Sequence, residues 1–220
     1  MSTNLIFILG LSIFIPVLVA LFRWKKIGKA YYPFLLLLVI WLVNEIISYL
    51  LIKQKQSNAI NCNIGYLVES LLITYQFNRW QLFNKNGNLY YFLMVSFVGA
   101  WLAETFLFES IRHFASHFII FHSFAITLLS INMLNRLIAS EKKGLLRNAI
   151  FLICVGFILF FTYSVVVETF YLFGLSASKS FQKAVTAILY AINFMTNLLY
   201  AYAVIWIPKK SRLMFTSSSW

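Results

Sequence analysis

Long apolar runs alternate with short polar connections along the chain, and this pattern predicts seven helices. A helix needs about 20 apolar residues to cross a bilayer, at a rise of about 1.5 Å per residue. The runs occupy residues 4–22, 31–52, 61–77, 89–108, 114–138, 148–173 and 183–207. We therefore expect an all-α, polytopic transmembrane bundle of seven spans, forming a single domain 1–220 that ends in a short basic tail at 208–220. The third run is the shortest, and six spans would remain if it turned back without crossing.

The composition favours lipid as the main solvent of this chain. The 220 residues are 61% hydrophobic and 11% charged, whereas a soluble domain is about 25% charged. The net charge of +12 would suggest a nucleic-acid partner in a soluble protein. Here the basic residues lie between the apolar runs, which is typical of membrane topology signals. We expect a lipid bilayer as partner and no nucleic acid.

The same basic residues predict an orientation. With seven spans, 13 of the 18 Lys and Arg residues fall on the side of the first, third and fifth loops and the C-terminus. Cytoplasmic loops carry an excess of Lys and Arg, so we expect the N-terminus outside and the C-terminus inside. Aromatic residues that favour the membrane boundary map to the same inner level: Trp24, Tyr31, Tyr32, Trp80, Tyr90, Tyr91 and Trp206.

Four carboxylates lie inside the apolar runs, and they are the first candidates for a site. The chain has no Asp, and four of its six acidic residues are Glu45, Glu69, Glu104 and Glu168 in these runs. A charged side chain at the centre of a membrane helix costs roughly 2.5–3.5 kcal/mol on insertion scales, so such groups usually face the bundle interior. Glu45, Glu104 and Glu168 fall in the outer half of spans two, four and six. Glu69 lies near the middle of span three and is the strongest single candidate for ligand or proton binding.

All three histidines fall in one short segment at the start of the fifth span. His113 and His117 are four residues apart and share a helix face, while His122 lies about 140° further round. They are at the level of Glu104, and a Glu and His cluster suits zinc or a proton relay. Alternatively, these groups hydrogen-bond neighbouring helices and hold the bundle together. We expect no cofactor, with zinc at these four residues as the alternative.

Two spans carry polar stripes at helical spacing. In the third span the stripe is Cys62, Gly65, Tyr66, Glu69, Ser70, Thr74 and Gln76. In the seventh span it is Thr186, Tyr190, Asn193, Thr196, Asn197 and Tyr200. Both stripes must face inward, because lipid satisfies no polar group. Tyr66, Asn193 and Asn197 therefore join the candidate binding residues, with helix-to-helix hydrogen bonds of about 0.6 kcal/mol each as the alternative role.

A short motif gives a resemblance to a known group of proteins. Residues 61–72 read NCNIGYLVESLL, and their Tyr66-x-x-Glu69 pattern resembles small multi-span membrane proteins of Bacteroidota-type bacteria. The spacing of the later spans, the Asn-containing last span and the short basic tail are similar too, so the likeness covers most of the chain. That group is uncharacterised and has no known activity. The resemblance implies a multi-pass protein of the bacterial inner (plasma) membrane and transfers no functional residue.

Three functions remain open on the sequence. The first is a non-enzymatic sensor or ligand-binding protein with a polar cavity in its outer half, which would signal through a separate partner protein. The second is a metal-dependent membrane hydrolase, similar in outline to the seven-span ceramidase and progestin-receptor-like hydrolases. This chain departs from them, because it has no Asp and no His in its seventh span. The third is a small proton-linked transporter. Phosphate-binding Gly loops and the GxSxG motif are missing from the sequence, so a non-enzymatic function is favoured and the metal-dependent hydrolase is kept as the enzymatic alternative.

Overall fold

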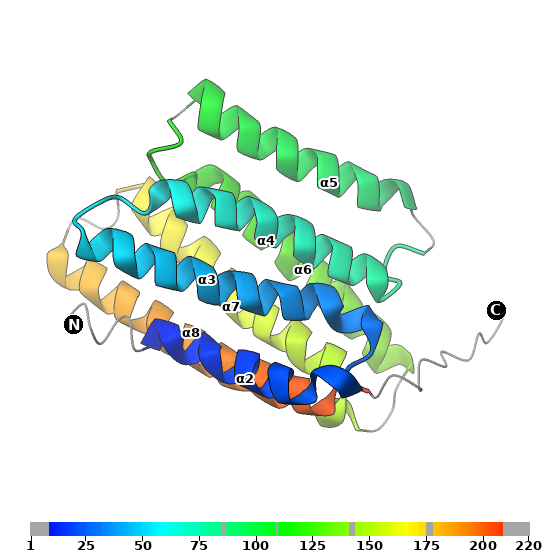
Figure 1. The fold of residues 1–220 in the computed structure, drawn as a ribbon. Helices are drawn as coiled ribbons and strands as arrows, with labels where there is room; N and C mark the ends of the chain where they lie inside the picture. The colour runs from blue at the N-terminus through cyan, green and yellow to red at the C-terminus, as the bar shows by residue number, and fades with distance from the viewer. Residues whose placement is uncertain (1–8, 85–86, 109, 141–143, 175–177, 209–220) are drawn as a thin grey trace.

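The computed structural model describes residues 9–84, 87–108, 110–140, 144–174 and 178–208. Within them every regular element is helical, so the expected all-α class is confirmed. Seven α-helices of the described chain run between the two ends of one bundle (Figure 1). They are α2 (Phe14–Arg23), α3 (Tyr32–Lys53), α4 (Ala59–Arg79), α5 (Gly87–Leu102), α6 (Ser116–Ser140), α7 (Ala149–Leu172) and α8 (Lys179–Trp206).

Short 3₁₀ turns and one π-helical segment extend or connect these α-helices. Single 3₁₀ turns lie at Leu11–Ile13, Trp24–Lys26, Lys29–Tyr31 and Leu145–Arg147, and a π-helical segment, Ala103–Phe108, continues α5. The helix ends differ from the expected runs by only a few residues, because polar and turn-forming residues stop each run where the helix stops. Only the first run is partly untested, since residues 1–8 lie outside the described part.

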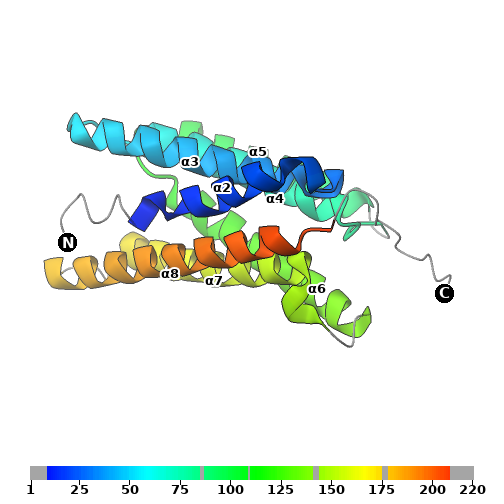
Figure 2. The same cartoon turned by 60° about the horizontal axis from the view of Figure 1, so that its bottom comes forward.

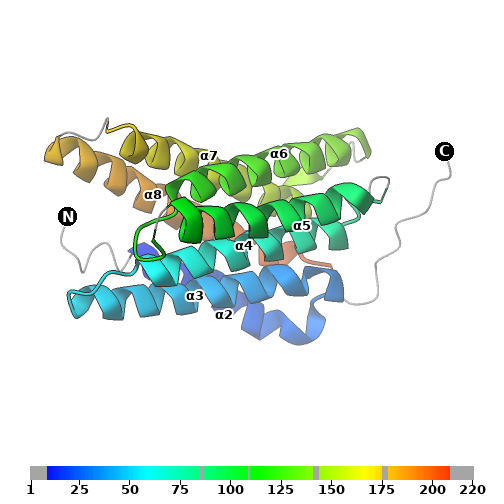
Figure 3. The same ribbon diagram turned by 90° about the horizontal axis from the view of Figure 1, so that it is seen from above.

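The helices form two layers. Figure 2 shows α3, α4 and α5 in one layer and α6, α7 and α8 in the other. α2 packs against both α3 and α8 and so closes one side between the layers. α4 contacts α3, α5 and α6. α5 is the outermost helix in Figure 1, and in the view from above it lies nearest the viewer, in front of α4 (Figure 3).

Five segments of the described chain are long and apolar enough to cross a membrane. They are Lys29–Lys53, Gly87–Phe108, Ser116–Ser140, Ala149–Leu172 and Phe181–Trp206. This is consistent with a multi-pass membrane protein, although with five such segments rather than the expected seven. α2 has only 10 residues. α4 has 21 residues, which gives about 31 Å at 1.5 Å each. It is therefore long enough to cross a membrane, and only its polar composition keeps it out of this group.

The polar residues of α4 are used inside the bundle. Near its end, Gln76 is buried and joins the start of α3: its Nε2 donates to the Ala30 carbonyl at 2.7 Å, and its Oε1 accepts from the Phe34 amide at 2.8 Å. Near its beginning, the fully buried Asn63 binds the segment before α6. These contacts explain why a helix that packs against α3, α5 and α6 is also one of the least apolar in the bundle.

The larger apolar core fills one half of the bundle, and a smaller apolar cluster of Phe97, Trp101, Ala115 and Phe118 lies beside α4 toward the other end. The larger core lies toward the end that carries the α2–α3 connection, and rings pack at its centre. Tyr200 lies 5.4 Å from Phe34 and 5.8 Å from Phe157, and Trp41 stacks on Tyr200 at 5.9 Å between ring centroids. Beyond Tyr200, toward the end that carries the α3–α4 and α7–α8 connections, polar side chains replace the apolar ones. The site lies there.

Candidate functional site

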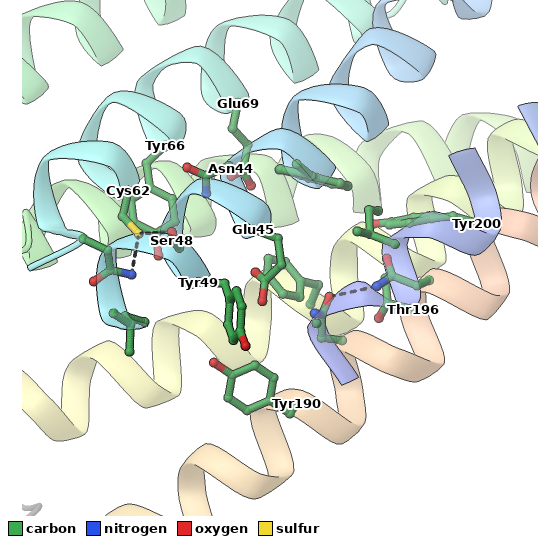
Figure 4. Close-up of a pocket in the computed structure, with 18 of the residues that line it drawn as sticks. Asn44, Glu45, Ser48, Tyr49, Cys62, Tyr66, Glu69, Tyr190, Thr196 and Tyr200 are labelled. Atoms are coloured by element: carbon green, nitrogen blue, oxygen red, sulfur yellow. Dashed lines mark hydrogen bonds between the residues drawn. The ribbon is translucent and has the colours of Figure 1, made fainter. Parts of the chain in front are cut away.

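A polar cavity of about 300 Å³ lies toward this end of the bundle (Figure 4). The 3₁₀ turn before α2, together with α3, α4 and α8, supplies most of its wall. The polar residues that line it are Asn44, Glu45, Ser48, Asn58, Cys62, Glu69, Asn193, Thr196 and Asn197. The aromatic residues that line it are Trp41, Tyr49, Tyr66, Phe114, Phe160, Tyr190 and Tyr200. Five of the seven expected ligand-binding residues lie here: Glu45, Tyr66, Glu69, Asn193 and Asn197.

Glu45 projects into the cavity from α3 (Figure 4). Its carboxylate passes close to Gly10, where an added Cβ atom would meet Oε1 and force the Glu45 side chain to shift. No donor from the described part of the chain hydrogen-bonds this carboxylate. The group is half-buried and remains available to a ligand.

Glu69 lies deeper, on α4. It is 4% exposed, and the Trp41 side chain hydrogen-bonds its carboxyl group. Its Oε1 atom has no partner among the described residues. Two more polar atoms of the cavity wall are buried and lack partners in the same way, the hydroxyl groups of Thr196 and Tyr200. Because buried polar groups are almost always hydrogen-bonded, these atoms point to a polar occupant.

A second, smaller cavity lies on the other side of Glu69. Its volume is about 70 Å³, and Tyr66, Glu69 and Phe160 line both cavities. His122 lines the second one from α6: its Nδ1 donates to the Phe118 carbonyl at 3.0 Å, which leaves Nε2 as an acceptor. Neither that Nε2 nor the Ser123 hydroxyl has a partner in the described structure. A water molecule needs roughly 10–15 Å³ of such space, so the second cavity has room for several.

Glu168 and Glu104 lie outside the larger cavity. Glu168 lines the second cavity and accepts a hydrogen bond from the Ser116 hydroxyl at 2.9 Å. Glu104, in the π-helical segment after α5, accepts from the backbone amides of His117 and Phe118 and thereby caps the first turn of α6. A carboxylate there is also stabilised by the helix dipole. Glu104 therefore has a structural role in the described geometry.

The three histidines take different environments. His117 donates from Nδ1 to Glu104 at 3.1 Å, and its side chain is 65% exposed. His113 is exposed before α6, whereas His122 is 1% exposed and packs against Phe118. No group of three or more His, Cys, Asp or Glu side chains that could hold a metal ion occurs among the described residues. Their geometry does not support a shared zinc site, and zinc stays a prediction of the sequence.

The α8 candidates join α8 to the chain before α2. The Asn197 Nδ2 donates to the Ser12 hydroxyl at 2.8 Å and lies 3.3 Å from the Asn193 Oδ1. These amides line the cavity, and Asn197 also ties α8 to the 3₁₀ turn before α2. Ligand binding by them stays a prediction. Asn193 is half-buried and faces the cavity.

Sequence reasoning missed most of the α3 wall, although a signal was available. Cavity-lining residues of α3 are Trp41, Asn44, Glu45, Ser48, Tyr49 and Ile52. Their spacing of three, four, seven, eight and eleven residues from the first places them on one helix face. Among these residues only Glu45 carries a charge, and a single amide, hydroxyl or aromatic group in an apolar run is a weaker signal than a carboxylate.

Comparisons with protein-family models, with curated proteins and with solved structures found no match to this chain.

Proposed function

We propose that this chain is a seven-helix membrane protein that binds a small ligand in its larger cavity without transforming it. The observation that carries the proposal is the cavity itself, whose wall includes the unpartnered buried oxygens of Glu69, Thr196 and Tyr200. Small-molecule sites are concave and combine apolar or aromatic walls with a few converging polar groups. The cavity has this composition, and the proposal needs no catalytic group.

The proposal includes α2 and α4 among the spans. α4 is long enough to cross, and its polar side chains are directed to neighbouring helices, so lipid does not meet most of them. We further propose that the cavity faces outside and that the opposite end faces the cytoplasm of a bacterial inner membrane, because seven spans would assign 13 of the 18 basic residues of the sequence to the cytoplasmic side. A ligand signal would then pass to a partner protein. Reporter fusions at the C-terminus, active only in the cytoplasm, test this orientation.

Ligand binding is tested on the full chain in lipid nanodiscs. A library of small polar metabolites is screened for compounds that raise the unfolding temperature. Asn193→Phe, which places a ring in the cavity, is the comparison variant, and compounds bound there should no longer stabilise it. Compounds that stabilise both proteins equally bind elsewhere. A library without one compound that discriminates the two would contradict the proposal.

Cys62 provides a second test of the same cavity. Its thiol lines the cavity and lies 3.4 Å from the Asn58 Nδ2, whereas Cys154 is completely buried. A small neutral thiol reagent should therefore modify Cys62 and spare Cys154, and a bound ligand should slow the reaction. If the reagent fails to modify either cysteine in the absence of ligand, the cavity is closed to solutes.

A proton-linked carrier is the second candidate function. It is favoured by the way in which Glu69 separates the two cavities, with the unpartnered Nε2 of His122 and the hydroxyl group of Ser123 beyond it. Waters in the second cavity would link these groups, so that ligand binding beside Glu69 could release a proton. Uptake of a ligand found in the screen into liposomes, driven by an imposed pH gradient and lost in Glu69→Gln, would establish this function. Binding without uptake would leave the first.

A further inference from the structure

We infer that the ligand of the larger cavity is a small organic cation, such as a primary amine or a quaternary ammonium compound. This inference rests on the proposed function, because it names the chemical class of the ligand that the cavity would take. Three features of the described residues carry it: the charge of the wall, the aromatic groups around it and the size of the space.

The wall carries acidic groups without basic partners. Glu45 and Glu69 both line the cavity, and no Lys, Arg or His belongs to the described residues that line it. Glu45 meets no donor from the described chain, and the buried Oε1 of Glu69 has no partner there. The basic residues of this end that the structure places, Lys53 and Lys55 among them, are exposed and outside the wall. A cation would favour the ionised form of these two carboxyl groups and be attracted by it, whereas an anion would be repelled by it.

Aromatic groups surround the same space. Seven aromatic side chains line it, from α3, α4, α7 and α8 and from the segment before α6. Organic cations are attracted to aromatic faces, and enclosure by several rings is a common way to bind quaternary ammonium groups. Figure 4 shows Tyr49 and Tyr190 beside Glu45, so a cation at that carboxylate would have rings next to it.

The volume limits the size of this cation. About 300 Å³ is at the lower end of the roughly 300–1,000 Å³ that is usual for ligand pockets. Long polyamines and lipid-sized cations are too large to be enclosed, while a compact compound of the size of choline is suitable.

Cys62 makes the charge preference measurable without knowledge of the natural ligand. In a Cys154→Ala background, Cys62 is treated with three methanethiosulfonate reagents: methyl (neutral), trimethylammonium-ethyl (cationic) and sulfonatoethyl (anionic). The thiolate of Cys62 displaces methanesulfinate and forms a mixed disulfide in each case. Rates are divided by those of each reagent with a free thiol in solution. We expect the cationic reagent to react at least tenfold faster than the anionic one.

The variant Glu45→Gln should remove most of this preference. The ratio of the cationic rate to the anionic rate does not depend on the reactivity of the thiol itself. It therefore reports the electrostatic potential that the reagents meet in the cavity. Glu104→Gln is the matched control, because it removes one carboxylate at the same end of the bundle, outside both cavities, and should keep the preference.

A measurement on the protein without charge variants completes the test. Choline should slow the reaction of Cys62 with the neutral reagent, and 3,3-dimethylbutan-1-ol, its uncharged isostere, should not. If the isostere protects equally, or if the cationic and anionic reagents react alike, the cation inference is overturned while the ligand cavity stands. If no reagent reaches Cys62, the cavity is closed and the proposed function fails as well.

Discussion

Asn63 holds the segment before α6 in place, and its removal should be among the most damaging single changes in this protein. Its side chain is completely buried. The Nδ2 atom donates to the carbonyls of Ile111 at 3.1 Å and His113 at 2.6 Å, and Oδ1 accepts from the Ala115 amide at 3.0 Å. One amide group therefore satisfies three backbone groups of a connection that has no regular structure.

The expected loss in Asn63→Ala follows from these contacts. Side-chain hydrogen bonds in membrane proteins contribute about 0.6 kcal/mol on average and up to about 1.7 kcal/mol each. Three bonds therefore give about 2–5 kcal/mol, and the upper part of this range is expected because the variant leaves buried backbone groups without partners. The measurement is reversible unfolding by SDS in mixed micelles, with amide hydrogen exchange at residues 111–118 as the local readout.

Asn78→Ala is the control for this prediction. Asn78 lies on the same helix and is half-buried, and its side chain makes no hydrogen bond within the described structure. Its replacement removes the same atoms and should cost less than about 0.5 kcal/mol, as is usual for positions without special contacts. If the two variants lose equal stability, or if Asn63→Ala leaves hydrogen exchange before α6 unchanged, the assignment of this role to Asn63 is wrong.

Three further changes test the fold by the same unfolding assay. Glu104→Ala should cost about 1–2 kcal/mol because α6 loses its cap, and Glu104→Gln should cost less because an oxygen acceptor remains; equal losses would show that the negative charge, and not the retained acceptor, provides the stabilisation. Gly156→Ala should cost about 1–3 kcal/mol, because its Cβ would collide with the Tyr200 ring. In contrast, Gly99→Ala, with nothing within 4 Å of its Cβ, should be neutral or stabilising by up to about 1 kcal/mol. A larger loss of stability in Gly99→Ala than in Gly156→Ala would refute the close packing of Gly156 against Tyr200. Gln76→Leu should cost about 1–3 kcal/mol, because two buried backbone groups at the start of α3 lose their partner, and an unchanged free energy of unfolding would show that they find another.

The sequence predicts the helices well but not the partners of their polar groups. Counting residues along an apolar run gives the level of a side chain along the bundle, and this placed Glu45, Glu104 and Glu168 in the same half. Rotation about the helix axis depends on packing between segments that are far apart in the chain. Glu45 consequently faces the larger cavity, Glu168 the second one and Glu104 the first turn of α6.

The histidines show that the relative direction of two side chains around the axis of one helix is predictable. Five residues separate His117 from His122, which predicts about 140° between them, and one side chain is 65% exposed while the other residue is 1% exposed. Spacing within one helix is local and can be read from the sequence. The contact of His117 with Glu104 joins two helices through an irregular connection, and no local pattern indicates it.

The composition of the cavity wall has a consequence for the biosynthesis of this protein. Glu45 and Glu69 belong to early helices, whereas Tyr190 and the amides of α8 that enclose the same space come about 120 residues after Glu69. At roughly 5–20 residues per second, the ribosome needs about 6–24 s to supply them. In the proposed membrane setting, both carboxylates would enter the bilayer with their enclosure unfinished. They would have to be protonated, hydrated or sheltered by the insertion machinery until the last helix arrives.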